Sequence, residues 1–315
     1  MRQGLEKAQA LQGLPEVHPE PGLSNLRGEI RKSPSSKIFS TGQVREIPQD
    51  AEEGWEVIAL DEFEFVISET PALESPVFIE GLPGVGNVGR IVATHLISVF
   101  GGRKFGELYS TSFPHQVKNL PDGTLRMMRN EIHFTSDPLD MVILTGDMQP
   151  LPTDFGSHYR MANSILEFCG KMNVKSIIAV GGYALGEDTD GRRKVFVGTS
   201  SPGLAGRYEG PDVKLLDEEP GTPIVGVSGL LPAMSSEIDA VCLLGQTSGD
   251  IKPDVEAASA VLDVISSMLD IQIDLNDLEK ASQSIEREME DIMNRIQKVE
   301  RLKPKVGWGK EGYIH

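Results

Sequence analysis

Three glycines, spaced Gly84-x-Gly86-x-x-Gly89, have a pattern that could bind a phosphate group. They follow the apolar run Val77–Glu80, which predicts a strand, and they precede residues 91–99, which predict a helix. In such a unit glycines let a phosphate approach the backbone at the helix N-terminus, where N–H groups and the helix dipole favour an anion. The spacing defines a candidate ligand crevice at Gly84, Gly86, Asn87 and Gly89.

Two polar residues, Asp147 and Gln149, could complete that crevice from the opposite side. They follow the apolar run Asp140–Thr145, and the carboxyl ends of parallel strands border the ligand crevice of an α/β sheet. The alternative is structural, because glycines also permit close packing and positive φ, and Asp147 could close a turn through its side chain. Glu107 lies at the distance of a ribose-binding acid but precedes the strand-like residues 108–113. No Gly-Lys-Ser/Thr follows the glycines, so the turn is not a P-loop.

The sequence offers little for catalysis. None of the six histidines has a metal-binding spacing, and no Gly-x-Ser-x-Gly motif is present. A base–acid pair of His115 and Asp147 is conceivable, but the sequence does not bring them together. Cys169 and Cys242 are far apart in apolar contexts, which predicts buried thiols. We therefore expect no metal, no cofactor and a binding protein rather than an enzyme.

The charge and hydropathy of the chain argue against two classes of partner, nucleic acids and membranes. The 315 residues carry 30 basic and 47 acidic side chains, a net charge of −17, which argues against a nucleic-acid-binding surface. No apolar run is long enough to span a membrane, and the N-terminus lacks the apolar core of a signal peptide. We expect a cytoplasmic protein with no membrane partner. Residues 1–50 mix Pro, Gly, Ser and charge without a period, which predicts a disordered or loosely ordered extension.

From residue 51 to 271 short apolar runs alternate with amphipathic segments. This alternation predicts an α/β domain with a mostly parallel sheet and helices on both faces. Glycine-rich turns are expected after the strands, at Gly81, Gly146, Gly181, Gly229 and Gly245. The expected strands are residues 63–67, 77–80, 140–145, 176–180, 195–197, 224–227 and 240–244, and the expected helices are residues 91–99, 155–169 and a segment opened by Pro253.

Residues 272–303 have the a/d heptad pattern of a coiled-coil helix. The alternatives are a helix laid against its own domain, a hairpin within the chain or a bundle between subunits. The two series, offset by three residues, are Leu275, Ser282, Met289 and Ile296, and Leu278, Ile285, Ile292 and Val299. We expect the apolar members to mediate oligomerisation.

Pro304 ends that helix, and residues 304–315 follow as a glycine-rich tail. Glycines around Trp308 and Tyr313 suit a tail that becomes ordered on a partner and buries aromatic anchors. Trp308, Tyr313 and Ile314 are the candidate partner-binding residues. The alternative is a frayed end without a role.

Four motifs together resemble the archaeal branch of the proteasome assembly chaperone family, whose sequences have also been labelled ATP-grasp-related. The match runs from about Trp55 to Leu302. The motifs are Pro76-Val-Phe-Ile-Glu-Gly-Leu-Pro-Gly-Val-Gly-Asn-Val-Gly89, Gly146-Asp-Met-Gln-Pro150, Gly181-Gly-Tyr183 and Gly229-Leu-Leu-Pro232.

This resemblance implies a nucleoside-phosphorylase-like α/β fold adapted to binding, homo-oligomers, and a role in assembling proteasome α-subunits. Some members dock through a C-terminal hydrophobic–Tyr–any-residue tail. This chain departs from that pattern, because Tyr313 is third from the end and Gly312 precedes it.

Two functions follow as hypotheses. The first is a non-enzymatic assembly factor that binds proteasome α-subunits or related assembly factors as a homo-oligomer. The alternative is a nucleotide-binding enzyme or sensor that uses the turn 81–89. A scaffold for an unrelated partner is a third, weaker option. The nucleotide-binding hypothesis requires an open pocket at the turn, instead of one filled by Leu82, Pro83 and Val85.

Overall fold

The structure is a computed structural model, which describes residues 37–40, 43–46, 62–151, 154–185, 193–205, 212–216, 223–249 and 252–287. All of these residues belong to the unit Ser36–His315. Within these segments, no helix has both the length and the apolar character that a membrane crossing requires.

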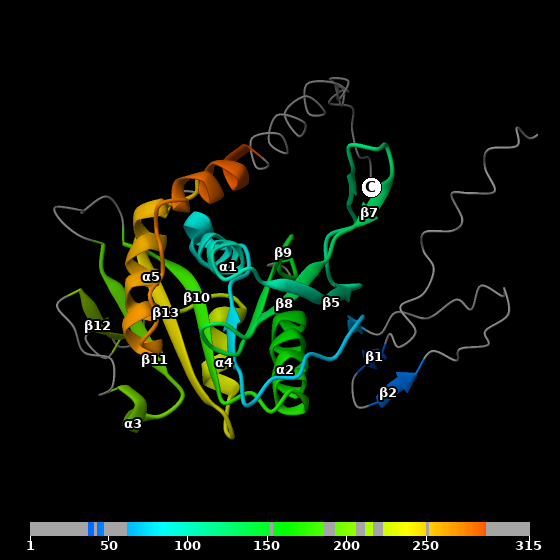
Figure 1. Cartoon of the computed structure of the whole chain (residues 1–315), viewed down its shortest axis with the longest axis horizontal. Helices are drawn as coiled ribbons and strands as arrows, with labels where there is room; N and C mark the ends of the chain where they lie inside the picture. The colour runs from blue at the N-terminus through cyan, green and yellow to red at the C-terminus, as the bar shows by residue number, and fades with distance from the viewer. Residues whose placement is uncertain are drawn as a thin grey trace, which may run out of the picture. The chain divides into compact units, whose positions relative to one another are not determined.

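An eleven-stranded mixed sheet forms the centre of this unit, in the order β12-β11-β13-β10-β4-β9-β8-β5-β3-β1-β2 (Figure 1). Four neighbouring strands at its centre are parallel: β13 (Asp239–Thr247), β10 (Ser176–Ala184), β4 (Val77–Glu80) and β9 (Met141–Gly146). Their continuous apolar sequences suit strands that are buried on both faces.

Antiparallel strands flank this parallel centre. On one side lie β8 (Asn130–Thr135), β5 (Arg103–Ser110), β3 (Phe63–Ile67), β1 (Lys37–Ser40) and β2 (Gln43–Glu46). On the other, β11 (Val195–Thr199) is antiparallel to β13 and parallel to β12 (Val213–Leu215). The α/β fold is confirmed, but the expected mostly parallel sheet describes only its centre. The step from β8 to β9 is too short for the crossover that parallel pairing needs.

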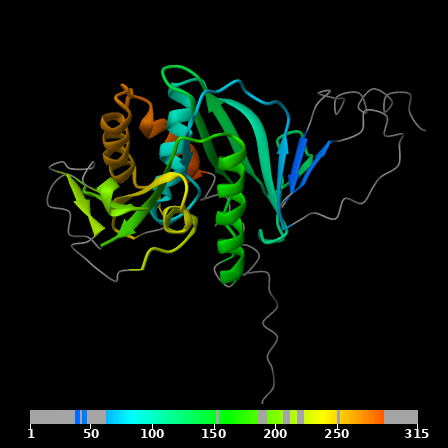
Figure 2. The same ribbon diagram turned by 90° about the horizontal axis from the view of Figure 1, so that it is seen from below.

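Helices cover both faces of the sheet, as predicted (Figures 1 and 2). One face carries α1 (Val88–Val99) and α5 (Val255–Leu269), whose apolar side chains share a buried cluster with Ile79 and Ile143. The other carries α2 (Phe155–Lys171) and α4 (Val227–Met234), which pack in a cluster with Phe78 and Val142. Alternating side chains of β4 and β9 thus serve both layers. Two short helices, η2 (Val85–Asn87) and α3 (Pro202–Ala205), are also described.

Several glycines expected to form turns lie inside regular elements instead. Gly181 and Gly182 are within β10 and Gly245 is within β13. A Cβ at Gly182 would lie 2.3 Å from the Val85 carbonyl oxygen, and one at Gly245 would lie 2.8 Å from that of Ala257. These glycines permit close backbone contact rather than a change of direction.

Residues 224–227 were expected to be a strand, but this prediction is wrong. Gly226 has φ +102, and α4 begins at the next residue, so Gly229 is helical. The apolar Ile-Val-Gly-Val sequence is too short for its period to distinguish a strand from a buried helix start.

The first part of the heptad segment packs on its own domain. Residues 278–287 are helical, and Leu278 and Ile285 are each 3% exposed. Both belong to the buried cluster of α1 and α5, against which Leu275 also packs. The His95 Nε2 atom lies 2.7 Å from the Asp274 carbonyl oxygen, which ties α1 to this segment. The other heptad residues, Met289, Ile292, Ile296 and Val299, lie outside the described residues, as does the tail with Trp308, Tyr313 and Ile314.

The segment 1–50 is described only at β1 and β2. These two strands extend the sheet beyond β3, with Lys37 opposite Ile67 and Phe39 opposite Phe65.

Candidate functional site

The glycine turn after β4 is closely packed. Gly86 has φ +60, and a Cβ there would lie 2.9 Å from Thr247 Oγ1 at the end of β13. A Cβ at Gly89 would lie 2.5 Å from the Val180 carbonyl oxygen. Both positions therefore need glycine for local geometry, whether or not a ligand approaches. This favours the structural interpretation of the fingerprint.

Gln149 lies at the turn, as predicted, but both ends of its amide are bonded to the protein. Its Nε2 donates to the Pro83 carbonyl oxygen at 2.9 Å, and its Oε1 accepts from the Val227 N–H at 2.9 Å. The side chain therefore links the β4–α1 turn to the start of α4. Gly84 faces this amide, with 3.9 Å between its would-be Cβ and Gln149 Nε2.

The other residues of the turn differ in exposure, and Gly84 is exposed. Asn87, the N-cap of α1, is 4% exposed, and Leu82 is 2% exposed, whereas Val85 is 42% exposed. Gly86, Gly89 and Gln149 thus meet at one edge of the sheet. They pack against β13, β10 and the start of α4, so the nucleotide hypothesis loses its main support.

Glu80, at the end of β4, is a buried carboxyl that the sequence interpretation treated only as part of a strand. It is fully buried, and its Oε1 accepts from the Leu82 N–H at 3.0 Å. Burial raises the pKa of Glu80 to about 8, against the opposing effect of backbone hydrogen bonds from Leu82 and Val180. The carboxyl is therefore neutral through the neutral pH range. The burial of Cys242 and its proximity to Glu80 raise the pKa of the Cys242 thiol.

Asp147 contacts two cations of a small hairpin instead of the glycine turn. Its carboxylate contacts Lys118 Nζ and Arg126 Nη1, each at 2.7 Å, and accepts from the Arg129 N–H at 3.1 Å. Burial raises the pKa of Asp147, but the hydrogen bonds from Arg126 and Lys118 outweigh it and hold the pKa below its usual range. Asp147 is therefore a structural anion rather than a partner for His115, which is exposed.

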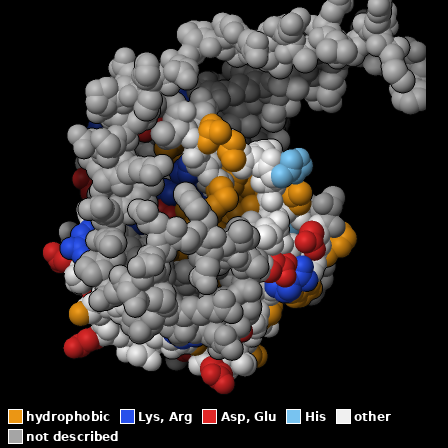
Figure 3. All heavy atoms as spheres, turned by 90° about the vertical axis from the view of Figure 1, so that its right-hand side faces the viewer, with side chains coloured by type: hydrophobic (Ala, Val, Ile, Leu, Met, Phe, Trp, Pro, Cys, Tyr) orange, Lys and Arg blue, Asp and Glu red, His pale blue; other side chains and the backbone are white. Residues whose placement is uncertain are grey.

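The hairpin consists of β6 (Val117–Asn119) and β7 (Leu125–Met127), which pair in a separate two-stranded sheet. We call it the arm. Lys118 lies opposite Arg126, and both face Asp147. The neighbouring Val117, Leu125 and Met127 are 57%, 70% and 51% exposed, so alternate side chains give the arm a cationic inner face and an apolar outer face. Figure 3, viewed from the side of β7 in Figure 1, shows hydrophobic side chains at the surface there.

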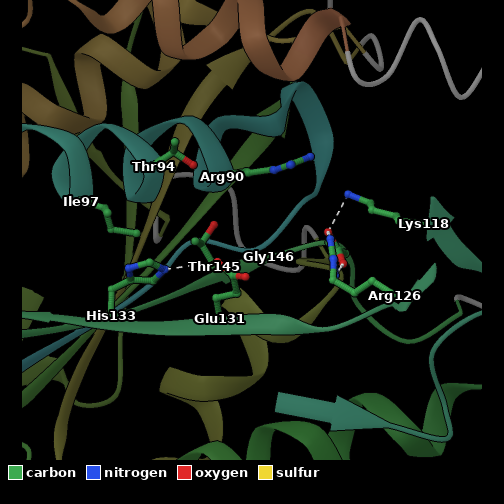
Figure 4. Close-up of a pocket in the computed structure, with 10 residues that line it drawn as sticks. Arg90, Thr94, Ile97, Lys118, Arg126, Glu131, His133, Thr145 and Gly146 are labelled. Carbon is green, nitrogen blue, oxygen red and sulfur yellow. Dashed lines mark hydrogen bonds and ion pairs between the residues drawn. The ribbon is translucent and has the colours of Figure 1, made fainter. Parts of the chain in front are cut away.

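A cavity of about 360 Å³ lies between the arm, α1, β8 and the end of β9 (Figure 4). None of residues 81–89 lines it. Its walls are formed by Arg90, Thr94 and Ile97 of α1, Glu131 and His133 of β8, Thr145, Gly146 and Asp147 at the end of β9, and Lys118 and Arg126 of the arm.

Glu131 belongs to a charged network on β5 and β8. It contacts Arg129 Nη2 at 2.9 Å and Lys104 Nζ at 3.6 Å, and both cations also pair with Glu107. The hydrogen bond from His133, opposed by burial, and the charges of Lys104 and Arg129 lower the pKa of Glu131 to about 2. Glu131 is thus ionised and already matched by cations outside the cavity.

This arrangement suits binding better than acid–base catalysis. Both carboxylates at the cavity have lowered pKa values, whereas a general acid or base needs a pKa near the working pH. Among the described residues, no group of His, Cys, Asp and Glu is placed to hold a metal ion. Cys169 and Cys242 are free and buried, as predicted.

The sequence interpretation missed Arg90, Lys118 and Arg126. One signal was available, because Pro121-Asp-Gly123 between Val-Lys-Asn and Leu-Arg-Met is a turn sequence between alternating polar and apolar residues. That pattern predicts a hairpin with both cations on one face. Nothing in the sequence places this face against Asp147.

Comparisons with known proteins agree with this fold. The uncharacterized protein MJ1210 of Methanocaldococcus jannaschii is 33% identical over 228 residues, which cover 72% of this chain and 86% of that protein. Among solved structures, PbaB of Pyrococcus furiosus, described as an archaeal proteasome activator, has 34% identity and a TM-score of 0.66. The similarity covers 76% of this chain and all of PbaB.

PbaA of Pyrococcus furiosus, described as an archaeal homolog of proteasome-assembly chaperone, has 26% identity and a TM-score of 0.60 over 76% of this chain and 99% of PbaA. The PAC2 family matches residues 78–293, which include the glycine turn, Asp147 and Gln149, α4 and the start of the heptad segment. The resemblance noted from the four sequence motifs is therefore confirmed, and this chain belongs to the PAC2 family.

Proposed function

We propose that this protein is a non-enzymatic, cytoplasmic assembly factor that binds proteasome α-subunits as a homo-oligomer. The observation that carries the proposal is the similarity to PbaA, a homolog of proteasome-assembly chaperone, which extends over 99% of PbaA. A similarity over the whole domain supports a shared type of partner more strongly than one shared motif would.

The contacts of the polar residues support a binding role. Gln149 joins the β4–α1 turn to α4, and Asp147 holds the arm through Lys118 and Arg126. Gly86 and Gly89 serve backbone packing. The residues that looked most suited to chemistry in the sequence therefore have structural work in the domain.

The proposal assigns two roles to the C-terminal region. Met289, Ile292, Ile296 and Val299 would associate between subunits, because they continue the heptads beyond the part that packs on α1 and α5. Trp308, Tyr313 and Ile314 would anchor the tail on the α-subunits.

An activator of assembled proteasomes is the second candidate function. It is favoured by PbaB, which is 34% identical to this chain, against 26% for PbaA. The two functions differ in their target, since an assembly factor engages free α-subunits and an activator engages the finished particle.

Truncation of the tail tests the proposal. The full chain should bind immobilised α-subunits, and deletion of residues 305–315 should weaken binding at least about tenfold while thermal unfolding stays unchanged. Trp308→Ala with Tyr313→Ala should reproduce the loss, and Lys305→Ala with Lys310→Ala is the matched control. Unchanged affinity after truncation would remove the tail from the proposal, and absence of binding by the full chain would reject it.

Peptide hydrolysis by assembled particles separates the two functions. An assembly factor should leave the rate of preformed particles unchanged and raise the yield of particles from subunits. An activator should raise the rate of preformed particles without changing their number.

A further inference from the structure

We propose that an exposed apolar surface at the carboxyl edge of the parallel strands is the docking site for the tail, residues 304–315, of the same chain. We call this surface the rim. It consists of exposed apolar side chains in the β4–α1 turn and at or just before the starts of α2 and α4: Val85, Leu151, Phe155, Tyr159 and Val225. The rim would hold the tail whenever no partner engages it.

The first argument is the apolar stripe of α2, which continues past the core. Ala162 and Cys169 in this stripe are fully buried, whereas Phe155 and Tyr159 are 77% and 56% exposed. The two aromatic residues are four positions apart, so they lie on the same face of the helix. The start of α2 therefore presents an uncovered aromatic pair, and exposed apolar surface of this kind marks sites of protein interaction.

The second argument is that the other rim residues lie beside this pair. α2 and α4 pack in one buried cluster, and both helices begin at the edge where the parallel strands end. The Gln149 amide links the β4–α1 turn to the start of α4, which places Val85 and Val225 at this edge. Val225 is 84% exposed, and Leu151 is exposed between Gln149 and α2. The rim is thus a gathered surface, whereas singly scattered apolar side chains would need no explanation.

Charge favours the tail as the occupant over the surface of a second copy. Residues 301–315, which include the tail, carry four basic side chains and one acidic side chain, in a chain whose net charge is −17. A second copy would bring the same net negative charge to the rim, whereas the tail brings the opposite sign. At the border of the rim the carboxylates of Glu62 and Asp154 both pair with Arg160, so this border does not repel a basic segment.

The length of the chain allows docking on its own domain. The described residues end at Arg287, and residues 288–315 follow. The tail alone spans about 40 Å when extended, which is close to the width of about 45 Å expected for a domain of this size. A tail and a rim on one chain meet at an effective concentration on the order of millimolar, which favours docking within the chain over docking between chains. Trp308 would pack on the aromatic pair of α2.

Fluorescence of Trp308 in the full chain tests the proposal. The chain has two tryptophans, so Trp55→Phe leaves Trp308 as the reporter. Acrylamide should quench a docked Trp308 weakly. Phe155→Ala and Tyr159→Ala should each shift the ratio of docked to free tail about tenfold toward the free tail and raise quenching, because each removes an aromatic contact. Leu125→Ala is the matched control, since Leu125 is an exposed apolar residue of the arm outside the rim, and it should leave quenching unchanged.

A second chain separates docking within one chain from docking between chains. A chain with Trp55→Phe and Trp308→Phe has an intact rim and no tryptophan signal. Added in excess to the Phe155→Ala reporter chain, it should leave the quenching of Trp308 high, and restored protection would show that the tail docks on another copy. That result would overturn the proposal.

Two results with the reporter chain itself would also overturn the proposal. One is quenching of Trp308 as strong as in the urea-unfolded chain. The other is protection that neither rim variant reduces. These measurements need no α-subunits, so their outcome is independent of the tests of the proposed function.

Discussion

At the residue scale, Gly86 and Gly84 test whether the glycine fingerprint serves close packing or phosphate binding. Gly86→Ala should lower the free energy of unfolding by about 1–3 kcal/mol, because alanine is strained at φ +60 and its Cβ would meet Thr247 Oγ1. Gly84→Ala is the control, since its φ of −162 is extended and its nearest neighbour is 3.9 Å away. It should change stability by less than about 1 kcal/mol. Urea unfolding measures both, and equal losses would contradict the packing argument.

Glu80 predicts a particular dependence of stability on pH. Between its ordinary pKa of 4.5 and its folded pKa of about 8, the folded protein keeps a proton that the unfolded chain releases. The free energy of unfolding should therefore fall as pH rises through this window, by on the order of 1 kcal/mol per pH unit, and level off above it. Glu80→Gln should lack this contribution. Comparing urea unfolding of the two proteins from pH 5 to pH 9, on either side of that pKa, gives the difference, and parallel curves would show that Glu80 ionises normally.

The sequence predicted some of these side-chain contacts and not others. The pairing of Gln149 with the glycine turn was expected from strand ends that meet at one edge, and the structure has it. The pairing of Asp147 with Lys118 and Arg126 was not predictable, because it depends on how the arm folds back. Burial of Glu80 was hidden by its place at the end of an otherwise apolar run.

At the element scale, two helix N-caps of the same residue type differ in their surroundings. Asp154 caps α2 by accepting from the Ser157 N–H at 3.2 Å, and its side chain is 49% exposed. Asp254 caps α5 by accepting from the Ala257 N–H at 2.9 Å, is 10% exposed, and also contacts Arg193.

Replacing each cap with alanine should therefore have unequal effects. Asp154→Ala should cost about 1 kcal/mol, and Asp254→Ala should cost about 2 kcal/mol or more, because it also leaves the partly buried Arg193 without one of its partners. Thermal unfolding measures the order. A larger loss for Asp154→Ala would contradict the assigned roles.

Elements with a clear period were well predicted, and elements defined by glycine were not. The apolar spacing of Tyr159, Ala162, Leu166 and Cys169 indicated a helix, which is α2. The glycines of β10 and β13 instead suggested turns, because a sequence does not reveal whether a glycine serves a bend or a close backbone contact. The antiparallel flank was missed because alternation of strands and helices continues only through the parallel centre.

At the scale of the whole molecule, the heptad segment divides into two parts. Leu278→Ala and Ile285→Ala should each lower the free energy of unfolding by about 2–5 kcal/mol, because both side chains are buried with α1 and α5. Ile292→Ala and Val299→Ala lie farther along the heptad series of Leu278 and Ile285. They should leave domain unfolding nearly unchanged and shift the oligomer equilibrium toward smaller species, as measured by analytical ultracentrifugation. The reverse pattern would show that the first heptads mediate association.

The heptad pattern illustrates what a sequence leaves open at this scale. A narrow apolar stripe on a polar helix is equally suited to a partner subunit and to the helix's own domain. Structural similarity gives a different kind of information, since the proteins that share this domain include both an archaeal proteasome activator and a homolog of proteasome-assembly chaperone.

Native mass spectrometry of the full-length protein, alone and mixed with archaeal-type proteasome α-subunits, tests the central claim most directly. The proposed function predicts a discrete homo-oligomer whose mass increases by whole α-subunits on mixing. An oligomer or monomer whose mass is unchanged by α-subunits, under conditions in which PbaA or PbaB binds proteasome components, would contradict it.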